Sequence, residues 1–188
     1  MCEYLVERLR PGTEVVSRTM TDKKNLIDKC GEAAALLLHE DCQRVIIIWD
    51  LHPPWRLENP KGKEPCRHEE REGIIKSLEE AGVMSPDVHL ICICEELEAW
   101  LLADKRAIEA AIEKLIRRRP KIRGVRRDTE SVKKPKVRLD KIFKQHTHRP
   151  YQGHVHAIKI VRELPDLNKI KRSQSFTRFA LKATNTEL

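Results

Sequence analysis

The chain has 188 residues, of which 35% are charged and 40% hydrophobic, and its formal net charge is +8. This length can bury one sizeable core with a small helical appendage, and the composition is typical of an ordered globular protein. No stretch approaches the roughly 18 consecutive apolar residues that span a bilayer, and the start lacks the layout of a secretory signal. We therefore expect a cytoplasmic protein without a membrane partner.

The six cysteines have neither the density nor the spacing of a disulfide framework, so we expect free thiols. Cys92 and Cys94 lie two residues apart in an apolar run. In a strand they would share one face and behave as small buried hydrophobes. A metal site at this pair is the lesser alternative.

In chain order, the β-prone residues 13–18 predict a short strand, and helical spacing of apolar residues predicts a helix after Asp22 that runs to about His39. Residues 44–50 then include five consecutive apolar residues and end in Asp50. Such an unbroken run is typical of a strand that is buried on both faces, as in a parallel sheet flanked by helices.

The long, proline-rich segment 51–65 predicts a loop, and its length suggests function or flexibility. A helix over 67–81, a strand over 88–94 and a helix over 105–118 follow. Strand, helix, strand and helix in this order predict an α/β fold with a mainly parallel central sheet.

Only helices are predicted near the end of the chain, over residues 137–143, 157–164 and 176–183. Ser173 or Ser175 could cap the last of them. We divide the chain into an α/β core (1–118), a basic linker or loop (119–136) and a helical C-terminal extension (137–188).

Basic charge is concentrated between Lys114 and Arg138, where twelve Lys or Arg residues face two acids, Asp128 and Glu130. Such a segment attracts polyanions, nucleic acid above all, although a solvated, mobile loop that only maintains solubility is an equal alternative. The candidate nucleic-acid contacts are Arg117, Arg118, Arg119, Lys121, Arg123, Arg126, Arg127, Lys133, Lys134 and Lys136.

Acidic residues follow two of the predicted strands: Asp50 ends one, and Glu95, Glu96 and Glu98 follow the other. Ligands of open α/β sheets bind beyond the carboxyl ends of the strands, where these side chains would converge. A cluster of carboxylates suits Mg²⁺, which could stabilise the oxygens of a phosphodiester reaction. Acids at strand ends also serve as helix caps and loop anchors, so both interpretations remain open.

Several segments resemble one family. They are residues 45–50 (VIIIWD), 90–104 (LICICEELEAWLLAD), 133–140 (KKPKVRLD) and 173–179 (SQSFTRF). They look like an uncharacterised bacterial Toprim-like family of the DUF4276 type, related to the nuclease half of OLD-type proteins. The resemblance implies a Toprim-like, Rossmann-like fold.

Toprim domains hold Mg²⁺ with a Glu after the first strand and an Asp-x-Asp after a later one. Asp50 matches the first Asp, whereas His52 stands at the second and suits Zn²⁺ or Mn²⁺ better than Mg²⁺. Glu3 would match the second Glu of the Glu-Gly-x-x-Glu-like turn with which such families usually begin, and the first strand and its Glu would then lie outside this sequence. Glu98 matches the acid before Ala-Trp and would either join the metal site or hold the loop at a helix N-terminus.

The resemblance thus implies Asp50, Glu3 and Glu98 as catalytic candidates, with Asp50, His52, Glu3, Glu96 and Glu98 as candidate ligands of Mg²⁺ or Mn²⁺. It also implies an ABC-type ATPase partner, since related proteins are often encoded beside such ATPases in bacterial defence systems. We expect a metal-dependent nuclease. The rival is a non-catalytic module that binds nucleic acid or the ATPase and retains a vestigial metal site.

Four histidines lie between His146 and His156. Their His-x-His spacing suggests zinc, but no nearby Cys or carboxylate completes the usual ligand set, so a polar connector is the better interpretation. Trp100 lies among leucines and is expected in the core rather than on a base-stacking surface.

Overall fold

The computed structural model describes residues 1–52, 66–123 and 129–185, which form two compact units. The first unit comprises Met1–Thr13 and Glu95–Leu188, and the second comprises Glu14–Cys94. The protein is therefore a mixed α/β protein in which the sheet and most of the helices belong to different units. The predicted boundaries at residues 118 and 136 follow another division and stay predictions.

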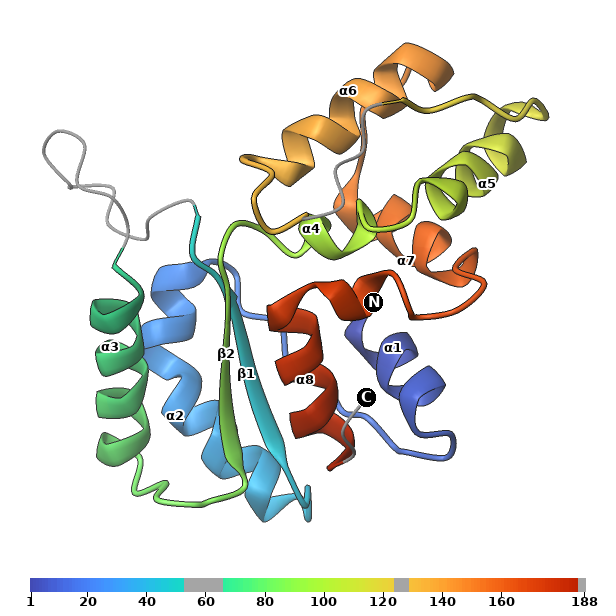
Figure 1. Cartoon of the computed structure of the whole chain (residues 1–188). Helices are drawn as coiled ribbons and strands as arrows, with labels where there is room; N and C mark the ends of the chain where they lie inside the picture. Colours follow the sequence, from blue (N-terminus) through green and yellow to red (C-terminus); the bar gives the residue numbers. More distant parts are fainter. Residues whose placement is uncertain (53–65, 124–128, 186–188) are drawn as a thin grey trace, which may run out of the picture. The chain divides into compact units, whose positions relative to one another are not determined.

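The second unit is a βαβ arrangement preceded by a helix (Figure 1). Its elements are α2 (Lys23–His39), β1 (Val45–Asp50), α3 (Arg67–Glu80) and β2 (Val88–Ile93). The two strands are parallel, with Val45 opposite Val88 and Asp50 opposite Ile93. The predicted parallel pairing is thus confirmed for the strands that the described residues form, whereas a larger Rossmann-like sheet is not confirmed.

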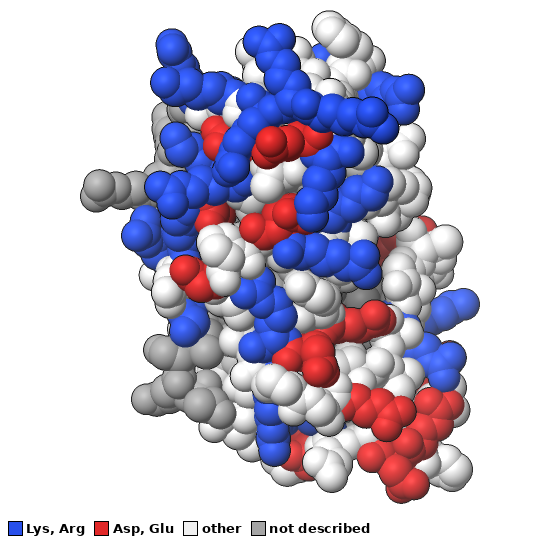
Figure 2. All heavy atoms as spheres, turned by 90° about the vertical axis from the view of Figure 1, so that its right-hand side faces the viewer, with Lys and Arg blue, Asp and Glu red and all other residues white. Residues whose placement is uncertain are grey.

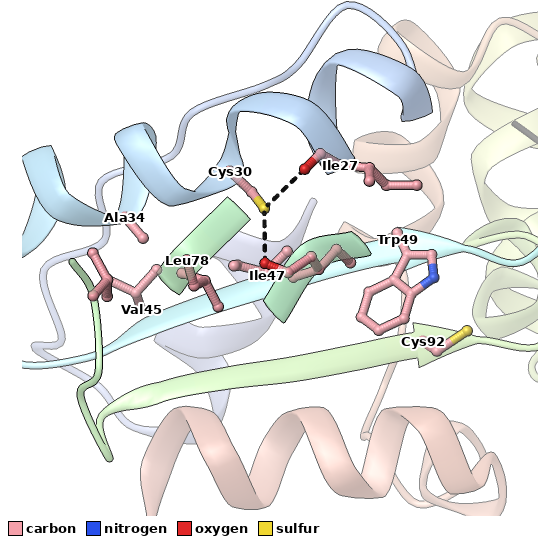
Figure 3. Packing of buried hydrophobic residues seen from close by; sticks show 10 residues of the cluster. Ile27, Cys30, Ala34, Val45, Ile47, Trp49, Leu78 and Cys92 are labelled. Carbon is pink, nitrogen blue, oxygen red and sulfur yellow. Dashed lines mark hydrogen bonds between the residues drawn. The ribbon is translucent and has the colours of Figure 1, made fainter. Parts of the chain in front are cut away.

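Helices α2 and α3 pack closely together in the second unit. A Cβ added at Gly31 would lie 1.9 Å from the backbone oxygen of Ser77, so only glycine allows this approach. The apolar residues of α2 and α3 meet the alternately buried Val45, Ile47 and Trp49 of β1 (Figure 3). This core fixes the face of β1 that carries Trp49.

The first unit is helical in the part of it that the structure describes. It contains α1 (Cys2–Leu9), α4 (Glu98–Leu101), α5 (Lys105–Ile116), α6 (Pro135–Thr147), α7 (Gly153–Arg162), a 3-10 turn (Ile170–Arg172) and α8 (Gln174–Thr184). Its core includes Trp100, which packs on Phe176 and Phe179 with ring centroids 5.2 and 5.4 Å away. Trp100 is fully buried, as predicted.

The strand predicted over residues 13–18 is wrong, because residues 13–20 have no regular secondary structure. Val15 and Val16 are 36% and 48% exposed, so their β propensity is not supported by packing. The one-turn helix α4 was not predicted, since four residues are too few to show helical periodicity. Most of the predicted loop 51–65 lies outside the described residues.

Local helix signals proved reliable. Asp22 caps α2 by accepting a hydrogen bond from the Asn25 amide, and Ser173 caps α8 by accepting one from the Phe176 amide. The six cysteines are free thiols. Among the helices that the structure describes, none is long and apolar enough to cross a membrane.

Candidate functional site

Asp50 is the last residue of β1, at the carboxyl end of the parallel pair. It is partly buried, on the opposite side of the strand from Trp49. The ladder extends one residue further, because the Leu51 amide donates to the Ile93 carbonyl at 2.8 Å. The backbone of Asp50 is therefore fixed at the strand end expected for a ligand site.

A buried polar network surrounds the backbone at this strand end, and it was not predicted from the sequence. Glu70, only 1% exposed, accepts hydrogen bonds from Trp49 Nε1 at 3.0 Å and from Lys23 Nζ at 3.1 Å. Lys23 Nζ also donates to the Leu51 carbonyl at 2.7 Å. One ion pair thus contacts the residues on both sides of Asp50.

Cys92 also lies near the carboxyl end of β2 and is 4% exposed. Burial raises the pKa of its thiol to about 12, so the thiol stays protonated at neutral pH. A protonated thiol is a poor metal ligand. This supports the interpretation of Cys92 as a small buried hydrophobe.

Two of the acids after β2 bind the start of a helix in the first unit. Glu95 Oε2 accepts a hydrogen bond from the Lys134 amide at 3.2 Å, and Glu96 Oε2 accepts one from the Lys136 amide at 2.8 Å. Helix α6 begins at Pro135, so these carboxylates satisfy amide groups at its N-terminus, where negative charge is favoured. The sequence had suggested a role at a helix N-terminus for Glu98 rather than for these two residues.

Glu98 begins α4 and lines a hollow together with Leu97, Leu101 and His154. Burial raises the pKa of its carboxyl group, an effect to which the charge of Glu96 adds, although the Glu98 backbone amide and Lys136 oppose it. Glu98 therefore stays a candidate because its carboxyl group lines this hollow.

Tyr151 borders the same region of the first unit. It is 6% exposed, and its buried hydroxyl has no hydrogen-bond partner among the described residues. Burial, followed by the charges of Glu98 and Glu96, raises the pKa of this hydroxyl group. It therefore stays protonated.

The predicted metal ligands fall in both units. Asp50 and His52 belong to the second unit, whereas Glu96, Glu98 and Glu3, which lies in the first turn of α1, belong to the first. Within the described ranges, no group of three or more His, Cys, Asp or Glu residues could hold a metal ion. The joint metal site stays a prediction.

The basic segment between α5 and α6 is tethered through its backbone. The Ile122 amide donates to Glu109 Oε1 at 2.9 Å, and Glu130 accepts hydrogen bonds from Ser173 and Ser175. With the contacts of Glu95 and Glu96, the described stretches on both sides of residues 124–128 are anchored by carboxylates. This argues against a freely mobile loop over those stretches.

The cationic side chains of this segment remain on the surface. Eight of the ten predicted nucleic-acid contacts are described, and all eight are exposed: Arg117, Arg118, Arg119, Lys121, Arg123, Lys133, Lys134 and Lys136. Arg126 and Arg127 lie outside the described residues. Figure 2 shows Lys and Arg side chains gathered over the upper part of the visible face, where Figure 1 places α5 and α6, with some carboxylates among them. We call these eight residues the basic surface.

His156 has a structural role within the histidine-rich segment. Its ring stacks near Phe143 with centroids 4.6 Å apart, and its Nδ1 accepts a hydrogen bond from the Gln152 amide at 2.8 Å. Burial lowers the pKa of His156, and the charges of Lys159 and His154 lower it further. His146 lies in α6 and both His154 and His156 lie in α7, so only residues 148–152 connect the two helices, and the contacts of His156 give it a packing role in α7.

Together these features define an α/β protein with an acidic strand end in one unit and an exposed basic surface in the other. The model of the DUF4276 family, a domain of unknown function, matches residues 7–182, and the chain belongs to this family. Comparison with curated proteins and with solved structures found no match.

Proposed function

We propose that the chain is a Toprim-like nucleic-acid phosphodiesterase that depends on Mg²⁺ or Mn²⁺. The observation that carries the proposal is the position of Asp50 at the carboxyl end of a parallel strand pair. This is where α/β proteins bind ligands and where a Toprim domain carries its metal-binding aspartate. The Toprim-like topology is itself part of the proposal.

In this proposal Asp50 is the principal metal ligand and His52 a supporting one, with Glu3, Glu96 and Glu98 as further candidates. Mg²⁺ needs only one or two carboxylates because water and phosphate oxygens complete its shell. The imidazole of His52 would shift the preference toward Mn²⁺. The metal would stabilise the attacking and leaving oxygens during cleavage.

Cleavage assays with labelled single- and double-stranded DNA and RNA test this function. The parent should cut at least one substrate with Mg²⁺ or Mn²⁺, and Asp50→Ala should abolish cutting because the principal ligand is lost. Asp28→Ala is the matched control, since Asp28 is an exposed acid of α2 whose partner is Lys24. Unchanged cleavage by Asp50→Ala would refute the assignment.

The basic surface supports nucleic acid as the substrate. Neutralising phosphates with Lys and Arg releases counterions, so affinity should fall steeply with salt. Replacing both Lys133 and Lys134 by Ala should weaken binding of all sequences alike and reduce the slope of log K against log salt by about 2. Fluorescence anisotropy with a labelled oligonucleotide measures both quantities, and Lys76→Ala on α3 serves as the control.

A second candidate is a non-catalytic binding module with a vestigial metal site. It is favoured by His52 and by the engagement of Glu95 and Glu96 in capping α6. A titration with Mg²⁺ or Mn²⁺ that follows the unfolding temperature distinguishes the two candidates, because a ligand that binds the native state raises its apparent stability. A shift that vanishes in Asp50→Ala supports the enzyme, and no shift at millimolar metal supports the module.

An ABC-type ATPase remains the proposed partner, on the family resemblance alone. If such an ATPase is encoded beside this chain, the two purified proteins should co-elute in size-exclusion chromatography. Separate elution with and without ATP would remove the partner from the proposal.

A further inference from the structure

The ion pair of Lys23 and Glu70 is unusual because it is buried. Glu70 is 1% exposed and the Lys23 side chain 12%. Removing two charges from water is unfavourable, and well-packed apolar residues often give equal or greater stability at such positions. A contribution to stability alone therefore does not explain this pair.

The pair makes two contacts with β1 or its continuation, one on each side of Asp50. Trp49 Nε1 donates to Glu70, and the carbonyl of Leu51 accepts from Lys23. The Leu51 amide is in turn fixed to Ile93 of β2. The residues directly before and after Asp50 are therefore held, the first through its side chain and the second through both backbone groups.

Lys23 and Glu70 come from different helices, which makes the arrangement rigid. Lys23 is the first residue of α2, and Glu70 lies in the first turn of α3. These helices pack closely at Gly31 and Ser77. The ion pair therefore connects the end of β1 to a helix pair that cannot easily shift.

We propose that Lys23 and Glu70 are positioning residues that hold the end of β1 so that the Asp50 carboxylate has one orientation toward a divalent cation. The link of this role to a metal ion at Asp50 rests on the proposed function. The restraint that Lys23 and Glu70 place on the end of β1 rests only on the hydrogen bonds described above. Residues that orient a metal ligand typically change metal affinity or activity 10- to 100-fold when they are replaced.

The test replaces the pair without leaving a buried charge, in the double variant Lys23→Met with Glu70→Gln. The amide oxygen of the introduced glutamine can still accept from Trp49 Nε1, so the fold should be retained, as circular dichroism and thermal unfolding will report. Lys24→Met with Asp28→Asn is the matched control, because that ion pair lies one residue further along α2 and is exposed.

Two quantities are measured in both double variants. The first is hydrogen exchange of the Leu51 amide relative to amides at the centre of β1, which reports opening of the strand end without any metal. The second is the Mn²⁺ dissociation constant. We expect about tenfold faster relative exchange and about tenfold weaker Mn²⁺ binding in the Lys23/Glu70 variant, and no change in the control.

Unchanged Leu51 exchange would overturn the positioning role, whatever the metal does. Faster exchange with unchanged Mn²⁺ affinity would overturn the link to Asp50. If the parent binds no Mn²⁺ and Asp50→Ala behaves like the parent, the proposed function fails, and faster Leu51 exchange would still establish the hold on the strand end. The two failures are thus distinguishable.

Discussion

The two units hold their candidate residues by different means. In the second unit, close backbone packing of α2 on α3 and one buried ion pair fix the end of β1 around Asp50. In the first unit, carboxylates such as Glu96 and Glu130 bind amides and hydroxyls from distant segments. An acidic residue can thus be a candidate ligand in one unit and a structural acceptor in the other, and its contacts rather than its residue type decide between these roles.

The most destabilising substitution should be one that separates the packed helices of the second unit. Gly31→Ala should destabilise the protein by about 3 kcal/mol, because the new Cβ would lie 1.9 Å from the Ser77 carbonyl and the helices would have to separate. Urea unfolding followed by circular dichroism measures this. Gly73→Ala is the control, because its Cβ would meet one side-chain methyl group, Cγ2 of Ile27 at 2.7 Å, rather than backbone, and should cost about 1 kcal/mol. Equal effects would contradict the close approach.

The next effect breaks a hydrogen-bond network of the first unit. In Ser175→Ala, Trp100 Nε1 loses its buried acceptor, which should cost about 2 kcal/mol in the same unfolding experiment. A cost near zero would show that this network does not hold the unit.

The same variant has a predicted pH dependence. Burial alone would raise the pKa of Glu130, but hydrogen bonds from Ser173 and Ser175 outweigh it and lower the pKa below the usual 4.5. The stability that Glu130 contributes is therefore present above pH 4.5 and is lost as the pH falls through the lower folded-state pKa. Ser175→Ala should reduce this loss, and an unchanged acid profile would show that the Ser175 hydroxyl does not contribute to it.

Smaller effects are expected for the glutamates that follow β2. Glu96→Ala should cost about 1 kcal/mol, as expected for a lost helix cap, and leave Mn²⁺ affinity unchanged if its role is structural.

The Glu98→Gln variant should gain stability relative to the parent protein as the pH rises above 4.5. The raised pKa of Glu98 means that the folded state disfavours its charged form, and glutamine does not ionise. Loss of Mn²⁺ binding in either variant would instead make that residue a ligand.

The smallest effect concerns His156. Because burial lowers its pKa below 6.5, the unfolded state binds a proton first, and stability should decline as the pH falls below 6.5. His156→Gln keeps an acceptor for the Gln152 amide but does not titrate. Its unfolding temperature should therefore differ less between pH 5 and pH 7 than that of the parent protein. An identical difference in both proteins would exclude His156 as the cause.

Local patterns predicted most of the elements but not their partners. The five apolar residues of β1 and the caps Asp22 and Ser173 carry their signal within a few residues, so those elements were found. The strand predicted over residues 13–18 is wrong because a strand must pair with another strand, and the β propensity of its own residues does not show whether such a partner exists. Glu70 was missed because, in a charged helix, nothing local distinguishes a buried acid from exposed ones.

Contiguous residues are enough to show that Asp50 follows a buried strand and that basic charge is concentrated between α5 and α6. The packing of helices and strands, by contrast, buries Glu70 against Trp49 and brings Glu95 and Glu96 to the start of α6. A hydrogen bond between residues 20 to 40 positions apart depends on how the helices and strands pack. No local periodicity contains that information.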